Sequence, residues 1–139
     1  MGPPDPRTGL TRVRFLDEAA EDMRSLADTT RRLFLEALRL LVRLDRGELT
    51  PAPLHDFAKT GDLSDCGKIV VAVEGEPEYR IVVREVDGDI DVVDVIAVEN
   101  RLDDLPYLLA GLRLQRIDDP VRRSDAQRRV ARIRRHLEE

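Results

Sequence analysis

The sequence predicts an α+β fold, in which a small antiparallel sheet of three to four strands packs against an N-terminal helical hairpin. Apolar residues recur every three or four positions over residues 19–44 and again over 105–137, which is the spacing of helices that bury one face. Between these segments, residues 68–99 alternate with a period of two and are rich in Val and Ile, as strands are. A C-terminal helix and a helical extension complete the predicted order.

The N-terminal part begins with a short strand and continues into two helices. Alternation over residues 11–16 predicts a strand that adds to one edge of the sheet. Asp17 and Glu18 open the first helix, where the positive end of the helix dipole favours carboxylates. Thr29 or Thr30 is expected to cap the second helix. A tight turn between the two helices makes them an antiparallel pair.

Three further strands follow, over residues 68–74, 79–86 and 90–99, and they are joined by the short loops 75–78 and 87–89. Loops of this length and composition form hairpins, so the three strands are predicted to make an antiparallel meander. The last strand is apolar on both faces. It is therefore expected to be the central strand, covered on both sides.

The remaining segments are a connector, a short helix and a final helix. Pro, Gly and Asp residues over 47–66 predict an irregular connection. Leucines over 103–116 predict a short helix, and Pro120 marks the start of the last one. That last helix carries an apolar stripe surrounded by seven arginines between Arg122 and Arg135.

Length and composition favour one domain with appendages. The 139 residues divide into a frayed tail over 1–10, a domain over 11–117 and a basic amphipathic helical extension over 118–139. With 42% hydrophobic and 37% charged residues, the chain resembles neither a disordered nor a membrane protein. No apolar run approaches the roughly 20 residues of a membrane-spanning helix, and the start lacks the apolar segment of a signal peptide. We therefore expect a cytoplasmic protein without membrane partners.

The net charge of −5 is unevenly distributed along the chain. Residues 61–110 carry a net charge of −9 and residues 111–139 carry +4. A positive field over the whole domain is therefore excluded, and any contact with nucleic acid must be local. For the basic final helix, one hypothesis is that its arginines lie against the acidic surface of residues 85–104, in the same chain or in a second copy. The alternative is that they contact RNA or DNA phosphates.

No cofactor or metal site is predicted. His55 and His136 are single and far apart in the sequence, and Cys66 is the only cysteine, which excludes an intrachain disulfide. The acidic stretch 87–94 alternates with Ile and Val as a strand does and lacks a glutamate at the spacing of a calcium loop. Glycine-rich phosphate loops are absent as well.

Four residues in order along the chain stand out as a set. Lys68 begins one predicted strand in CGKIV, Arg80 lies in the next in EYRIVVR, Arg101 ends the third in VIAVENR, and Tyr107 follows six residues later. With the strand and helices before them, these residues resemble the RelE/ParE superfamily of toxin–antitoxin toxins. The resemblance covers roughly residues 12–117.

The resemblance implies a ribosome-dependent endoribonuclease that cuts messenger RNA and inhibits translation, by attack of a 2′-hydroxyl on the adjacent phosphate. Arg80 resembles the arginine that stabilises the phosphate, and Arg101 the one that stabilises charge or protonates the leaving group. Lys68 resembles the first of a lysine pair, whose second position is Val70 here. Tyr107 resembles the tyrosine that orients or deprotonates the hydroxyl.

The implied partners are a cognate antitoxin protein, the ribosome and messenger RNA, in a homodimer or a toxin–antitoxin heterotetramer. The alternative is a non-catalytic interaction module on the same fold, which inhibits a target such as gyrase or only binds a protein partner. Val70 and the acidic balance of the domain favour this alternative.

The predicted strand pairing, taken without the family resemblance, also brings these residues close together. Arg80 lies near the start of one strand and Arg101 follows the end of its antiparallel neighbour, so a hairpin brings the two together at one end of the sheet. Each also has a purely structural interpretation. Arg80 could pair with a carboxylate on a neighbouring strand, Arg101 could bond loop carbonyls, Tyr107 could pack under its helix, and Lys68 could be a charge that protects a strand edge.

Overall fold

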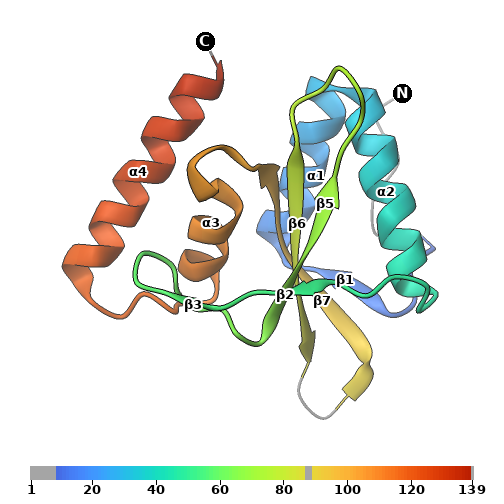
Figure 1. Cartoon of the computed structure of the whole chain (residues 1–139), viewed down its shortest axis with the longest axis horizontal. Helices are drawn as coiled ribbons and strands as arrows, with labels where there is room; N and C mark the ends of the chain where they lie inside the picture. The colour runs from blue at the N-terminus through green and yellow to red at the C-terminus, as the bar shows by residue number, and fades with distance from the viewer. Residues whose placement is uncertain (1–8, 87–88, 139) are drawn as a thin grey trace.

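The computed structural model describes residues 9–86 and 89–138, which form a mixed α/β fold with helices on both faces of a sheet (Figure 1). Two predictions fall largely outside these residues, namely the frayed tail over 1–10 and the turn at 87–89. Within the described part of the chain, the architecture comprises four α-helices, a five-stranded sheet and a separate two-stranded sheet.

The helices form two pairs, one on each face of the large sheet. Helices α1 (Asp17–Thr29) and α2 (Arg31–Asp45) cover one face. Helices α3 (Leu105–Arg113) and α4 (Pro120–Glu138) lie on the other, where α4 packs on the outside of α3 (Figure 1). The first helix begins at Asp17 as predicted. Thr30 occupies the cap position of α2, but its hydroxyl makes no capping hydrogen bond.

The five-stranded sheet has the order β1-β7-β6-β5-β2 and is mixed. Strand β6 pairs antiparallel with β5 and β7, and β2 pairs antiparallel with β5, whereas β1 runs parallel to β7. The prediction of a wholly antiparallel sheet of three or four strands is therefore wrong, because alternation of side chains carries no information on strand direction. The strands are β1 (Val13–Phe15), β2 (Ala52–Pro53), β5 (Cys66–Val71), β6 (Tyr79–Val86) and β7 (Asp89–Asn100).

Three further predictions need correction. The connector over 47–66 contains β2 and also β3 (Asp56–Phe57) and β4 (Gly61–Asp62), which form the two-stranded sheet. Strand β6, rather than β7, is central, although β7 is buried on both faces as expected. The helix predicted over 103–116 is shorter, because a 3₁₀ turn occupies Leu102–Asp104 before α3 begins.

Alternation along the strands creates two apolar cores, one on each face. Ile81 and Val83 of β6 pack under α1 and α2, while Val82 packs under α3. Arg80 shares the orientation of Val82, so it lies on the α3 face. Ala126, Val130 and Ile133 join α4 to the same core as α3.

The edge of β7 is closed partly by β1 and partly by side chains. Asp45 of α2 accepts backbone N–H groups of Thr11, Arg12 and Val13 at 2.6–3.0 Å, which anchors β1. Beyond the end of β1, Asp22 accepts the N–H of Val98 at 3.0 Å. Helices therefore fix both the short edge strand and the edge that it leaves uncovered.

Candidate functional site

Arg80 and Arg101 converge on one carboxylate at the end of the sheet. Arg80 of β6 pairs with Glu99 of β7 in the strand register, and the backbone N–H of Arg101 donates to the carbonyl of Glu78. The Glu78 Oε2 atom lies 2.5 Å from Nη2 of Arg80 and 3.1 Å from Nε of Arg101. A single oxyanion thus joins the two guanidinium groups, which the antiparallel pairing of β6 and β7 brings close together.

The two arginines differ in burial. The Arg80 side chain is 15% exposed, and its buried Nε atom has no hydrogen-bond partner within the described residues. Arg101 is 62% exposed and lines a depression of about 360 Å³ together with Glu78 and Asn100. The sheet therefore holds the Arg80 guanidinium with its Nε donor unpaired, and an unpaired donor is energetically costly when it is buried. The Arg101 guanidinium, although paired with Glu78, is exposed and accessible to a ligand from solvent.

A tight backbone turn brings Tyr107 to the same place. After β7, Asn100 accepts the N–H of Leu102, and Asp103 and Asp104 adopt left-handed conformations with φ of 50° and 63°. Asp tolerates this conformation better than most residues, so α3 starts directly above the sheet. Burial raises the pKa of Tyr107, with Asp104 and Glu78 adding to the rise and the charges of Arg80 and Arg101 opposing it. The phenol is therefore neutral at pH 7 and is able to donate a hydrogen bond.

Lys68 lies on the neighbouring strand and in a pocket with Tyr107. In β5, Val70 stands directly opposite Arg80, which makes Lys68 a diagonal neighbour of Arg80 on the same face. A pocket of about 160 Å³ is lined by Lys68 and Tyr107 and by Lys59 from the turn between β3 and β4. All four predicted residues therefore gather under the N-terminal end of α3.

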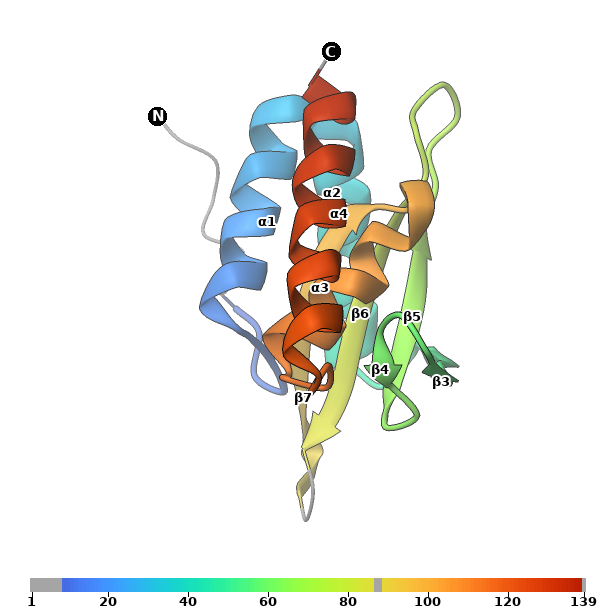
Figure 2. The same cartoon turned by 90° about the vertical axis from the view of Figure 1, so that its left-hand side faces the viewer.

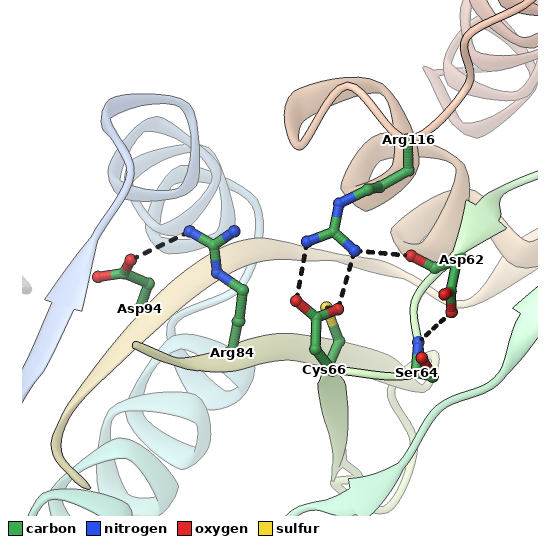
Figure 3. Close-up of polar contacts among 7 residues, drawn as sticks. Asp62, Ser64, Cys66, Arg84, Asp94 and Arg116 are labelled. Carbon is green, nitrogen blue, oxygen red and sulfur yellow. Dashed lines mark hydrogen bonds and ion pairs between the residues drawn. The ribbon is translucent and has the colours of Figure 1, made fainter. Parts of the chain in front are cut away.

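Arg84, the other arginine on this face of β6, belongs to a different cluster. Its Nη2 lies 3.5 Å from Asp94 Oδ2 (Figure 3). Arg14 approaches the other oxygen of the same carboxylate. In the same view, Arg116 binds Asp65 through two nitrogens and fixes the loop after α3 to the segment before β5. These ion pairs are structural, and Arg84 supplies a matched control for Arg80.

The single cysteine is not a nucleophile. Cys66 is buried at the start of β5, and burial together with the adjacent Asp65 carboxylate raises the pKa of its thiol to about 12. A thiol is nucleophilic only as the thiolate. Cysteine chemistry is therefore excluded at neutral pH.

A second cavity, of about 720 Å³, lies between α1, α4 and the end of β7. Glu99 faces it, and burial and the Asp22 charge raise the Glu99 pKa to about 7 against the opposing charges of Arg134 and Arg113. Arg134 also lies 4.0 Å from Asp22. Of the α4 arginines, Arg134 thus lies near Glu99 of the acidic segment 85–104 and near Asp22 outside it, and Arg128 instead pairs with Asp125 within the helix.

Glu99 gives the protein a pH-dependent stability. Its pKa is about 7 in the folded state against 4.5 for the free side chain, so the folded protein retains this proton where the unfolded chain loses it. The contribution to stability is complete below pH 4.5 and is lost as the pH rises through 7. Relative to the Glu99→Gln variant, we expect the free energy of unfolding of the wild type to fall by about 3 kcal/mol between pH 4 and pH 8. Urea unfolding of both proteins over this range measures it, and parallel pH profiles would contradict it.

Within residues 9–86 and 89–138, no three or more His, Cys, Asp or Glu side chains are grouped as metal ligands. Nor does any helix in the described ranges combine the length and apolarity that a membrane crossing requires.

Comparison of the chain with protein-family models, with curated proteins and with solved structures finds no match. The fold and the site therefore define only a class: a mixed α/β domain with two arginines, a lysine and a tyrosine at one end of its sheet. What this class does must be argued from the site itself.

The site also contains residues that the sequence analysis did not single out. Glu78 lies in a turn that was interpreted only as a loop, and Lys59, His55 and Phe57 lie in the connector expected to be irregular. The available signal in the sequence was a Phe in a polar, proline-rich connector. In the structure, Phe57 is 42% exposed and does not belong to either apolar core.

Proposed function

We propose that the protein is a cytoplasmic toxin of the RelE/ParE superfamily that cleaves messenger RNA on the ribosome. In this proposal, the arrangement of β5, β6 and β7 behind α1 and α2 is that of the superfamily. The observation that carries the proposal is the position of the Glu78 carboxylate between Arg80 and Arg101, beside Tyr107. A carboxylate is the nearest protein equivalent of a phosphate oxygen pair, so the two arginines are spaced to hold an oxyanion.

The chemistry needs no metal. The 2′-oxygen forms a bond to the adjacent phosphorus, and the bond between phosphorus and the 5′-oxygen breaks. This leaves a 2′,3′-cyclic phosphate and a 5′-hydroxyl, while the proton of the 2′-hydroxyl passes to solvent and one returns to the 5′-oxygen. Arg80 and Arg101 stabilise the charge that builds on the phosphorane. Tyr107, as a neutral donor, orients the attacking hydroxyl, and Lys68 adds positive charge nearby.

The proposal implies both a substrate assembly and an inhibitor. Since the site lacks a strong general base, the ribosome must position the RNA for attack, and cleavage should depend on it. A cognate antitoxin would neutralise the toxin by docking on the sheet or the groove at its end, in a heterotetramer or around a homodimer.

Expression of the protein in cells, followed by mapping of messenger RNA 5′ ends, tests the function. We expect codon-phased cuts with the wild type and with Arg84→Ala, and background levels with the double variant Arg80→Ala/Arg101→Ala. Arg84 is the matched control because it lies on the same strand and face but is held by Asp94. Cuts that persist in the double variant would contradict the proposal.

A second candidate function is a non-catalytic interaction module of the same superfamily. Two observations favour it. Val70 is 43% exposed at the position directly opposite Arg80, where the resemblance places a lysine, and Glu78 already neutralises part of the arginine pair. Growth inhibition without messenger RNA cuts in the experiment above would support this module, with gyrase as one target to examine.

A further inference from the structure

Strand β3 and the residue before it place aromatic rings beside the candidate site. The pocket of about 160 Å³ that holds Lys68 and Tyr107 is completed by Lys59, His55 and Phe57. The His55 and Phe57 rings meet edge to face, with centroids 6.2 Å apart. An exposed aromatic ring next to lysines is the combination with which proteins stack bases of single-stranded nucleic acids.

A second pocket, of about 250 Å³, continues from the first at Lys59 and reaches α4. It is lined by Arg122 and Arg129, which project from one flank of the helix, and by Asp125 between them. Figure 2 shows that the β3–β4 hairpin and α4 lie on the same side of the sheet, flanking α3. Asp125 forms its ion pair with Arg128 rather than with Arg122 or Arg129.

The balance of charge over the two pockets is positive. Lys59 pairs with Asp104 at 2.6 Å. For Lys68, Arg122 and Arg129, the described part of the chain supplies no ion-pair partner. The whole domain is acidic, so this concentration of free cations is local, as contact with a polyanion requires.

We infer that the surface made by the β3–β4 hairpin and the Arg122–Arg129 flank of α4 binds single-stranded RNA and leads it to the Arg80–Arg101 pair. The inference rests on the proposed function and names the surface that holds the substrate on one side of the scissile phosphate. Phe57 stacks a base, while Arg122 and Arg129 contact phosphates along the strand, and Lys59, held by Asp104, lines the passage between the two pockets. An acidic protein segment could use the cations but has no need of the exposed ring, which is why RNA is the favoured occupant.

Fluorescence anisotropy with a short, labelled, unstructured 2′-O-methyl RNA tests the inference on the full chain. The methyl group blocks the attacking hydroxyl, so binding is measured without cleavage. We expect Phe57→Ala to weaken binding at least about fivefold and Phe57→Tyr to retain it. Arg129→Ala should lower the slope of log affinity against log salt by about 0.7, the value for one phosphate contact with a single strand.

Arg135→Ala is the matched control, because Arg135 is exposed on α4 but lines neither pocket. Equal affinity for the wild type, Phe57→Ala and Arg129→Ala, or equal losses in Arg129→Ala and Arg135→Ala, would overturn the inference. Selective binding of a polyglutamate peptide in place of RNA would also overturn it and assign the surface to an acidic protein segment. The variants change exposed side chains, and their melting temperatures check that each one folds.

The RNA-binding surface and the proposed nuclease function can each be rejected without rejecting the other. RNA binding that depends on Phe57 and Arg129 without any messenger RNA cuts in cells supports the surface and rejects the nuclease. Codon-phased cuts, together with an RNA affinity that neither substitution changes, reject the surface and support the nuclease.

Discussion

Replacement of Asp22 by Ala is expected to lower the free energy of unfolding by about 3–5 kcal/mol, the largest effect of any single substitution considered. The Asp22 side chain is 6% exposed and that of Arg113 is 10% exposed, and the two form a bidentate pair with N–O distances of 2.6 and 3.0 Å. Without Asp22, the Arg113 charge stays buried without its partner, and the N–H of Val98 loses its acceptor. Thermal unfolding followed by circular dichroism should show a melting temperature lower by about 10–15 °C.

The adjacent surface pair provides the control. Glu21 pairs with Arg24 one turn along α1, with both side chains exposed, so Glu21→Ala should change stability by less than about 0.5 kcal/mol. The double variant Asp22→Leu/Arg113→Met removes both charges together and should recover the part of the loss that comes from the unpaired Arg113 charge, while the backbone groups of Ile96 and Val98 stay without their partners. An Asp22→Ala protein within 1 kcal/mol of the wild type would show that the buried pair does not hold the helices to the sheet.

Gly61→Ala is the second substitution with a large expected effect, a loss of about 3 kcal/mol. Gly61 has a φ of +78°, which disfavours any side chain, and a Cβ atom there would lie 2.2 Å from the carbonyl oxygen of Arg116. The contact is with backbone, so it is relieved only if the β3–β4 hairpin moves away from the loop that follows α3. Chemical denaturation of the variant measures the loss.

The Gly75→Ala variant separates the cost of the positive φ from the cost of the close backbone contact. Gly75 has nearly the same φ, +85°, but a Cβ atom there would meet nothing closer than a flexible arginine nitrogen at 3.9 Å. We therefore expect Gly75→Ala to cost about 1 kcal/mol, the conformational part alone. If both variants lose the same amount, the close approach of the hairpin is not tight, and Lys59 and Phe57 are not held where the RNA surface needs them.

Much of the fold was predictable from side-chain periodicity. Strands β5, β6 and β7 and the four α-helices fall where the periods of two and about 3.6 place them. Strands β2, β3 and β4 have two residues each, which is too short for any period to appear. Strand β1 is anchored by Asp45 of α2, which accepts backbone N–H groups of Thr11 and Val13 from more than thirty residues away, a contact that no local pattern reveals.

The candidate site was predictable to the extent that it depends on one hairpin. The approach of Arg80 and Arg101 follows from antiparallel pairing of β6 with β7, which the sequence indicated. The carboxylate between them was not predictable, because Glu78 lies in a loop whose side-chain directions are not periodic. The position of α4 was equally inaccessible, since its apolar stripe shows that it packs but not against which surface.

The side chains that cover β7 beyond β1 also bear on how the protein behaves in a crowded solution. The carbonyl of Ile96 is occupied by Arg113 and the N–H of Val98 by Asp22, so this stretch of strand offers no pairing template to a neighbouring molecule. Loss of the ion pair would therefore do more than weaken one chain. It would also expose an unpaired strand edge, and other molecules of the protein could pair with this edge and aggregate.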